Sequence, residues 1–239
     1  MALTDQRVVV LGGTSGIGLA TAALAARDGA QVVVASSSQG SVDRALASLP
    51  AGAAGYTVDL TDAADVGSLF DRTGPFDHLI YTAGEPLSLM ALDALHLDTA
   101  RRFFELRYFS ALSAVSAAVP YLRPGGSVAL TTGSAKDRPG PGWSVAASIC
   151  GAVDALVRAL AVELAPVRVN AVAPGVIRSP LWDSMPDADR EQMYRQLGET
   201  LPLGRVGEPE EVAEAFLFLL RATYTTGTIV TVDGGTLLA

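Results

Sequence analysis

The sequence contains one cysteine, one lysine and two histidines among 239 residues. A single cysteine excludes an internal disulfide, and two isolated histidines without clustered cysteines or acids provide no metal site. No apolar run approaches the roughly 18 residues that cross a bilayer. The chain does not open on a basic stretch followed by a long apolar segment, so no signal peptide is predicted. We therefore expect a cytoplasmic protein that is not held in a membrane.

Basic charge is scarce as well. The formal net charge is −8, and no basic stripe interrupts it, so the surface would repel nucleic acid. Of the 17 basic residues, all but Lys136 are arginine. Hydrophobic residues make up 49% of the chain and charged residues 18%, which is typical of a soluble globular protein. The length suits one large domain.

Short β-branched runs alternate with longer segments in which alanine and leucine have helical spacing. Near-continuous apolar strands, each followed by a helix, are typical of a parallel sheet covered on both faces. The predicted strands are 7–11, 31–35, 56–58, 78–81, 127–132, 167–172 and 228–232. The predicted helices are 16–27, 41–49, 63–72, 98–122, 146–164 and 210–220. This order predicts a single doubly wound α/β domain of the Rossmann type over residues 1–239, with a seven-stranded parallel sheet.

The longest stretch without a predicted strand covers residues 175–208. It contains Pro180, Pro186 and Pro202. Long segments of this kind often cover a binding site, so we expect a substrate lid here.

A glycine-rich turn follows the first predicted strand and opens the first helix. It reads Gly12-Gly13-Thr14-Ser15-Gly16-Ile17-Gly18. Glycine at this place lets the backbone turn tightly and lets a pyrophosphate approach the helix N-terminus, where unpaired N–H groups and the helix dipole attract an anion. The alternative is a turn that only joins two elements. The position of the glycine turn between a strand and a helix favours a dinucleotide-binding site over this alternative.

The pattern Gly12-x-x-x-Gly16-Ile17-Gly18 resembles the glycine motif of the short-chain dehydrogenase/reductase (SDR) family, although Leu11 stands where that family usually has threonine. Other segments resemble the family in the same order along nearly the whole chain. They are residues 59–60, 83–84, 170–180, 204–207, 226–227 and 232–235. The resemblance implies a nicotinamide dinucleotide cofactor, an alcohol or carbonyl substrate, and a homodimer or homotetramer.

The resemblance also implies which residues hold the cofactor. They are Gly12, Thr14, Ser15, Gly16, Ile17, Gly18, Asp59, Leu60, Ala83, Gly84, Pro174, Gly175, Ile177 and Ser179. An acid at the end of the second strand would bind the ribose hydroxyls of NAD and repel the extra phosphate of NADP. Ser36, Ser37 and Ser38 stand there instead, which favours NADP(H) over NAD(H). The alternative is that these serines form a turn before a helix that Ser41 caps.

Members of the family transfer hydride with an Asn, a Ser and a Tyr-x-x-x-Lys pair. A phenol, with a pKa near ~10, needs an adjacent cation to act as a base at neutral pH. Flanking segments place Ala146 and Cys150 at the tyrosine and lysine positions, or Val145 and Ile149 in a shifted register. No Tyr-x-x-x-Lys occurs anywhere in the chain, so the proton relay of the family is absent.

The same alignment places Arg107 at the asparagine position and Thr132 at the serine position, with Ser134 just beyond. Small residues have replaced two large polar ones, while an arginine stands on the facing helix. A dry void or an unpaired buried guanidinium would be costly. We therefore predict that Arg107 extends into the vacated space and pairs with cofactor, with a substrate anion or with an acid such as Asp137. The alternative is that Arg107 lies along the helix surface towards solvent.

Lys136 follows the fifth predicted strand, whose C-terminal end faces the ligand site in an open α/β sheet. It is a candidate general acid or anion-binding residue; alternatively it is a solvated charge paired with Asp137. Trp143 in the following loop either lines a ligand pocket or only packs against neighbouring side chains. Cys150 is either a small buried hydrophobe or a thiol that Arg107 activates.

Two functions fit this sequence. The first is an NADP(H)-dependent oxidoreductase of a small alcohol or carbonyl compound, in which Thr132 or Ser134 binds the oxygen and Arg107 or Lys136 is the polar partner. The second is a catalytically inactive dinucleotide-binding protein that acts as a sensor or as the partner of an active homologue. Chemistry other than hydride transfer in the same cleft is a third possibility.

Overall fold

The computed structural model describes residues 2–239 and arranges them around one parallel sheet of seven strands. The strands are β1 (Arg7–Leu11), β2 (Gln31–Ser36), β3 (Ala54–Thr57), β4 (Phe76–Tyr81), β5 (Leu122–Thr131), β6 (Arg168–Pro174) and β7 (Ile229–Val232). Their order across the sheet is β3-β2-β1-β4-β5-β6-β7. The doubly wound, seven-stranded α/β fold predicted from the sequence is confirmed.

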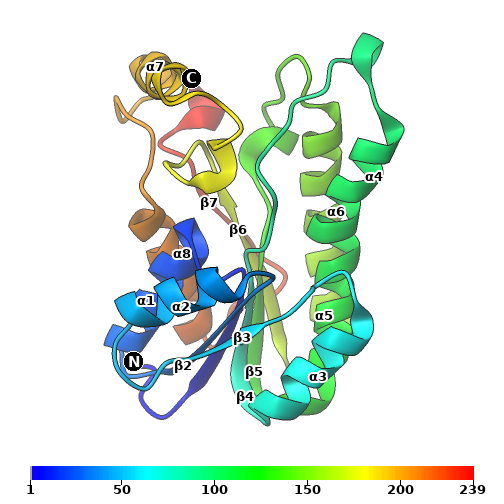
Figure 1. Cartoon of the computed structure of the whole chain (residues 1–239), viewed down its shortest axis with the longest axis vertical. Helices are drawn as coiled ribbons and strands as arrows, with labels where there is room; N and C mark the ends of the chain where they lie inside the picture. Colours follow the sequence, from blue (N-terminus) through cyan, green and yellow to red (C-terminus); the bar gives the residue numbers. More distant parts are fainter. Residues whose placement is uncertain (1) are drawn as a thin grey trace.

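Helices cover both faces of the sheet (Figure 1). One face carries α1 (Gly16–Arg27), α2 (Gln39–Ser48) and α8 (Pro209–Arg221). The other carries α3 (Ala63–Thr73), α4 (Leu97–Phe104), α5 (Ser110–Ala118) and α6 (Ser144–Glu163). Each face has its own apolar core, because strands such as β1 and β6 bury nearly all their side chains between the two helical layers.

The long helix predicted over residues 98–122 is interrupted. It consists of α4, a π-helical turn (Glu105–Phe109), α5 and a 3₁₀ turn (Val119–Tyr121). β5 begins immediately afterwards at Leu122, so the predicted helix extended one residue into the strand. Single π-helical turns inside a helix frequently occur at functional sites.

Two further helices differ from the prediction. α2 begins at Gln39, because the Ser38 hydroxyl oxygen accepts a hydrogen bond from the Ser41 backbone N–H at 3.4 Å; Ser38, and not Ser41, is the cap. α7 (Asp187–Thr200) forms inside the segment where the sequence predicts no helix. It buries only Tyr194 and Gly198, so it has too narrow an apolar stripe for hydrophobic periodicity to reveal it.

One helix, α6, is long and apolar enough to cross a membrane by length and composition. Its buried residues, among them Ile149, Val153 and Val157, belong to the core cluster on one face of the sheet. A core helix of a globular protein meets the same criterion, so one such helix is weak evidence of a membrane span.

The side chain of His78 in β4 is buried, and both ring nitrogens have partners. Nδ1 lies 2.8 Å from Ser127 Oγ, and Nε2 lies 2.9 Å from Gln6 Oε1. Burial, helped by the charge of Arg168, lowers the pKa of His78 from 6.5 to about 4, and Asp77 opposes this shift. The imidazole is therefore neutral in the folded protein at neutral pH.

We expect His78 to make the fold sensitive to acid between pH 6.5 and about 4. In that window the unfolded imidazole takes up a proton that the folded one does not, so stability is complete above it and falls as the pH drops through it. As the pH falls from 6.5 to about 4, the unfolding free energy of the wild type should drop by up to about 3 kcal/mol more than that of the His78→Gln variant. Urea titrations at a series of pH values measure this difference. The exposed His96→Gln is the matched control, and a His78→Gln slope equal to the wild-type slope would contradict the assignment.

Candidate functional site

The C-terminal ends of β1, β4, β5 and β6 open into a cleft of about 880 Å³. Ligands of doubly wound sheets bind where the strand order reverses, which here is between β1 and β4. Pockets for small molecules and cofactors usually measure about 300–1,000 Å³, and the cleft lies within this range.

The glycine turn forms the floor of this cleft. Gly12 has φ of +85°, and a Cβ on it would lie 2.5 Å from the backbone nitrogen of Ala83. A Cβ on Gly18 would overlap the carbonyl oxygen of Gly12. Ser15, the N-cap of α1, makes no side-chain cap, and no acid lies in the first turn of the helix. The turn therefore offers unblocked backbone N–H groups to an anion, and this arrangement fits the pyrophosphate of a dinucleotide.

Nearly all of the residues implied for the cofactor line this one cleft. They are Gly12, Thr14, Ser15, Gly16, Ile17, Gly18, Ser36, Ser37, Asp59, Leu60, Ala83, Gly84, Pro174, Gly175, Ile177 and Ser179. Ser38 does not line it, because its hydroxyl caps α2, and its inclusion is corrected here.

No charged side chain stands at the end of β2. Ser36 and Ser37 line the cleft there. Arg44, the basic residue of α2, donates to the Ser41 hydroxyl at 3.0 Å and is exposed. The β2 end thus presents hydroxyl groups without a carboxylate that would repel a phosphate.

The π-helical turn directs Arg107 into the cleft. The carbonyl of Leu106 in that turn accepts a hydrogen bond from the Tyr81 hydroxyl at 2.5 Å. The Arg107 guanidinium lies so close to Gly84 that a Cβ there would overlap it, and its Cζ is 5.4 Å from the centre of the Phe103 ring. Only 20% of the Arg107 side chain is exposed. The alternative of a guanidinium directed to solvent does not occur.

Glu85 is the acid that pairs with Arg107. Arg107 Nη2 donates to the Glu85 carbonyl, and Nε lies 3.4 Å from Glu85 Oε2. The suggested partner Asp137 was wrong. Burial lowers the pKa of Arg107 and Glu85 opposes the shift, but a guanidinium stays charged in proteins. Nη1 makes no hydrogen bond within residues 2–239, so one donor remains available to a ligand.

Lys136 does not line the cleft. Its ammonium lies 2.5 Å from Asp137 Oδ2 and 3.3 Å from Asp154 Oδ2, and 15% of its side chain is exposed. Burial alone would lower the pKa of Lys136, but the two carboxylates raise it above its usual value. Lys136 is therefore not a polar group of the cleft. Its predicted pairing with Asp137 is confirmed, but the side chain is not a freely solvated charge, because Asp154 of α6 also holds it.

The two hydroxyl groups predicted to bind the substrate oxygen, those of Thr132 and Ser134, differ in their hydrogen bonds. Thr132 lines the cleft, but its hydroxyl donates to the Cys150 carbonyl at 3.0 Å. Ser134 also lines the cleft, and its hydroxyl makes no hydrogen bond to any part of the chain that the structure describes. Cys150 and Ala146 lie in the same wall. Burial raises the pKa of the Cys150 thiol, so it has the character of a small buried hydrophobe.

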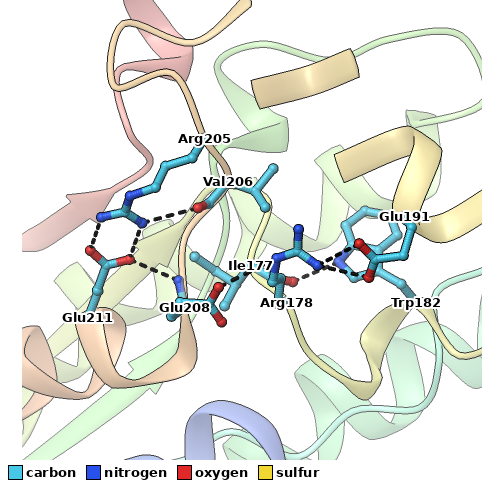
Figure 2. Close-up of polar contacts among 8 residues, drawn as sticks. All are labelled: Ile177, Arg178, Trp182, Glu191, Arg205, Val206, Glu208 and Glu211. Carbon is cyan, nitrogen blue, oxygen red and sulfur yellow. Dashed lines mark hydrogen bonds and ion pairs between the residues drawn. The ribbon is translucent and has the colours of Figure 1, made fainter. Parts of the chain in front are cut away.

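The segment after β6 connects the cofactor residues to α7 (Figure 2). The carbonyl of Ile177 accepts a hydrogen bond from the Trp182 indole at 3.0 Å. Arg178 donates to both carboxylate oxygens of Glu191 at 2.8 and 2.9 Å, and its Cζ lies 4.5 Å from the centre of the Tyr194 ring. Within the segment predicted as a lid, residues 175–208, Trp182 and α7 are thereby tied to residues 177 and 178, beside the predicted cofactor residues.

A second group of contacts fixes the other end of this segment. Arg205 makes a two-pronged pair with Glu211 at 2.7 and 2.6 Å, and Glu211 also accepts from the Glu208 backbone N–H at 2.9 Å (Figure 2). Arg178 Nε lies 3.4 Å from Glu208 Oε1 and joins the two groups. The start of α8 and the start of α7 are thus held by one connected network of charges.

Sequence reasoning missed three residues of this site. Glu85 directly follows Ala83-Gly84, and an acid beside an arginine of the same cleft is a signal that could have identified it. Tyr81 ends β4 and was not expected to position the π-helical turn, to which its hydroxyl donates. Nothing in the sequence indicated that Trp182 would line the cleft.

Comparisons with known proteins match this geometry. A family model described as enoyl-(acyl carrier protein) reductase matches residues 12–236. The chain is 39% identical to the short-chain dehydrogenase/reductase ATR9 of Stachybotrys chlorohalonatus, over 99% of this chain and 98% of that protein. The structure of MalC reductase/Diels-Alderase from Malbranchea aurantiaca has a TM-score of 0.92 and 30% identity, covering 99% of this chain and 98% of that one. An NADPH-bound short-chain oxidoreductase from Pseudomonas aeruginosa PAO1, described as containing an atypical catalytic center, has a TM-score of 0.90 and 30% identity, covering 98% of each chain.

Proposed function

This chain belongs to the short-chain dehydrogenase/reductase family of oxidoreductases, and on that premise we propose that it binds NADP(H) and acts on a small alcohol or carbonyl compound at an atypical active site. The observation that carries the proposal is the cleft itself. It joins the glycine turn to a buried arginine with a free donor. Ala146 and Cys150, which the sequence resemblance assigns to the positions of the family's tyrosine and lysine, line the same cleft.

The cofactor part of the proposal has three supports. The turn from Gly12 to Gly18 leaves room for a pyrophosphate that any Cβ at Gly12 or Gly18 would disturb. Ser36 and Ser37 offer hydroxyls where an acid would favour NAD(H). NADPH is bound in the related oxidoreductase of Pseudomonas aeruginosa. When bound, the nicotinamide supplies or accepts the hydride.

Arg107 and Ser134 carry the chemistry that this chain itself supplies. A carbonyl carbon that gains a hydride leaves an alkoxide on its oxygen, which must then take a proton. Arg107 Nη1 and the Ser134 hydroxyl are the donors available to that oxygen, and fixed donors in a cleft stabilise such a charge better than water does. Because a guanidinium does not give up its proton, solvent water supplies the proton to the alkoxide, and the hydroxide that remains is neutralised by the buffer. Thr132 and Lys136 have no part in this assignment, since both are engaged elsewhere.

Calorimetry with NADPH and NADH, followed by NADPH oxidation with a panel of ketones and aldehydes, tests the proposal. We expect NADPH to bind more tightly than NADH and at least one carbonyl compound to be reduced. Tight NADPH binding with no turnover on any compound would favour the inactive dinucleotide-binding protein. Failure of both dinucleotides to bind would overturn the proposal altogether.

A further inference from the structure

The outer part of the cleft is formed by an apolar cluster separate from the two cores of the sheet. Its buried members are Trp182, Tyr194 and Val206, and several half-buried residues pack against them. The members of this cluster that line the cleft include Leu87, Trp143, Leu181, Trp182, Leu197 and Leu201. Leu87 and Trp143 of this wall come from two loops, and its other members come from the segment predicted as a lid. Part of the wall is exposed to the cleft.

Two tryptophans of that wall lie together. The ring centres of Trp143 and Trp182 are 6.3 Å apart with an interplanar angle of 59°. The indole N–H of Trp182 is already used by the Ile177 carbonyl, so what Trp182 presents to a ligand is ring carbon. Aromatic rings favour offset-stacked or edge-to-face contact with other rings, which a saturated ring of similar volume does not reproduce.

The charged side chains around this wall have partners within the chain. On its rim, Asp183 pairs with Arg190 at 3.0 Å. Arg107 pairs with Glu85, and Arg138, which also lines the cleft, donates to the Thr236 carbonyl at 3.1 Å. A carbonyl oxygen directed at Arg107 would place the remainder of a ligand against the apolar wall.

We propose that the substrate of this cleft is an aromatic ketone or aldehyde, whose ring contacts Trp143 and Trp182 while its oxygen faces Arg107. This inference rests on the proposed function, because it names the substrate class of the same site. It adds a specificity-determining role for Trp143, which touches the substrate ring and not the dinucleotide.

The test compares two ligands of similar volume, naphthyl methyl ketone and its saturated decalinyl counterpart. Their binding to the full chain is measured by calorimetry in the presence of NADP⁺, where no reduction takes place, and again without a dinucleotide. We expect the naphthyl ketone to bind about threefold to tenfold more tightly than the decalinyl ketone. Equal or weaker binding of the naphthyl ketone would overturn the inference, whether or not the chain reduces either compound.

Trp143→Leu keeps an apolar side chain but removes the aromatic face. It should abolish the preference for the naphthyl ketone and leave NADPH binding unchanged, while Trp143→Phe should restore most of the preference. Tyr224→Leu, at a fully exposed aromatic residue outside the cleft, is the matched control. A preference that survives in Trp143→Leu would remove Trp143 from the site. A wild-type protein that does not bind NADPH would instead count against the proposed function.

Discussion

Replacing Arg107 by methionine is expected to lower kcat by about 10²–10³, the usual loss when one donor to a developing oxyanion is removed. Methionine keeps much of the apolar length of the side chain but has no donor for the alkoxide. NADPH binding should change less than kcat, because the Arg107 guanidinium pairs with Glu85 and is not part of the glycine turn. Steady-state rates with a carbonyl substrate and calorimetry with NADPH measure the two effects separately.

Two further variants serve as controls for the Arg107→Met experiment. Arg102→Met removes an exposed arginine of α4 on the same stretch of helix and should leave kcat unchanged. Because Arg107→Met leaves Glu85 as a half-buried carboxylate without its partner, Glu85→Gln is combined with it to separate catalysis from stability. Wild-type kcat in the folded Arg107→Met enzyme would refute the role of this arginine.

Adding a single methyl group at Gly18 should have a comparably large effect on the cofactor. In Gly18→Ala the new Cβ would overlap the Gly12 carbonyl and crowd the Thr82 hydroxyl. To relieve this overlap, the turn must move away from the position at which its N–H groups face the pyrophosphate. We therefore expect NADPH to bind more weakly to Gly18→Ala than to the wild type, because the N–H groups no longer face the pyrophosphate. Crowding should also lower the unfolding free energy by about 1–3 kcal/mol.

Gly67→Ala is the matched control for Gly18→Ala. Gly67 also lies inside a helix, α3, but a Cβ on it would meet no atom within 4 Å. Alanine is about 1 kcal/mol more favourable than glycine in a helix interior, so Gly67→Ala should stabilise the protein and leave NADPH binding unchanged. If both variants behaved alike, the close contact between Gly18 and Gly12 would not be the cause.

Periodicity was sufficient for the fold because the strands of this sheet are buried on both faces. After Arg7 the run in β1 is apolar without interruption, and such runs, each followed by a helix, are typical of a parallel sheet. The glycine turn could be placed for the same reason, since its meaning depends only on the strand before it and the helix after it.

The remaining features depend on contacts between segments distant in the sequence, which periodicity does not contain. Lys136 was expected to line the cleft, but its ammonium pairs with Asp154 and the residue is not among those that line it. Arg107 required the π-helical turn and Tyr81 to direct it, and Glu85 to balance its charge. The Thr132 hydroxyl donates to the Cys150 carbonyl, and the Ser38 hydroxyl caps α2. In each case a hydrogen-bond or ionic partner decided the outcome.

The most direct test follows the hydride. NADPH that carries deuterium at the reactive carbon of its nicotinamide is incubated with the wild-type protein and a carbonyl compound, and the alcohol is analysed by mass spectrometry. A cleft with Arg107 and Ser134 in place of a phenol and an ammonium should still transfer the label, so deuterium should appear on the carbinol carbon of the product. Bound NADPH that transfers its label to none of the carbonyl compounds would contradict the claim that this site performs hydride chemistry.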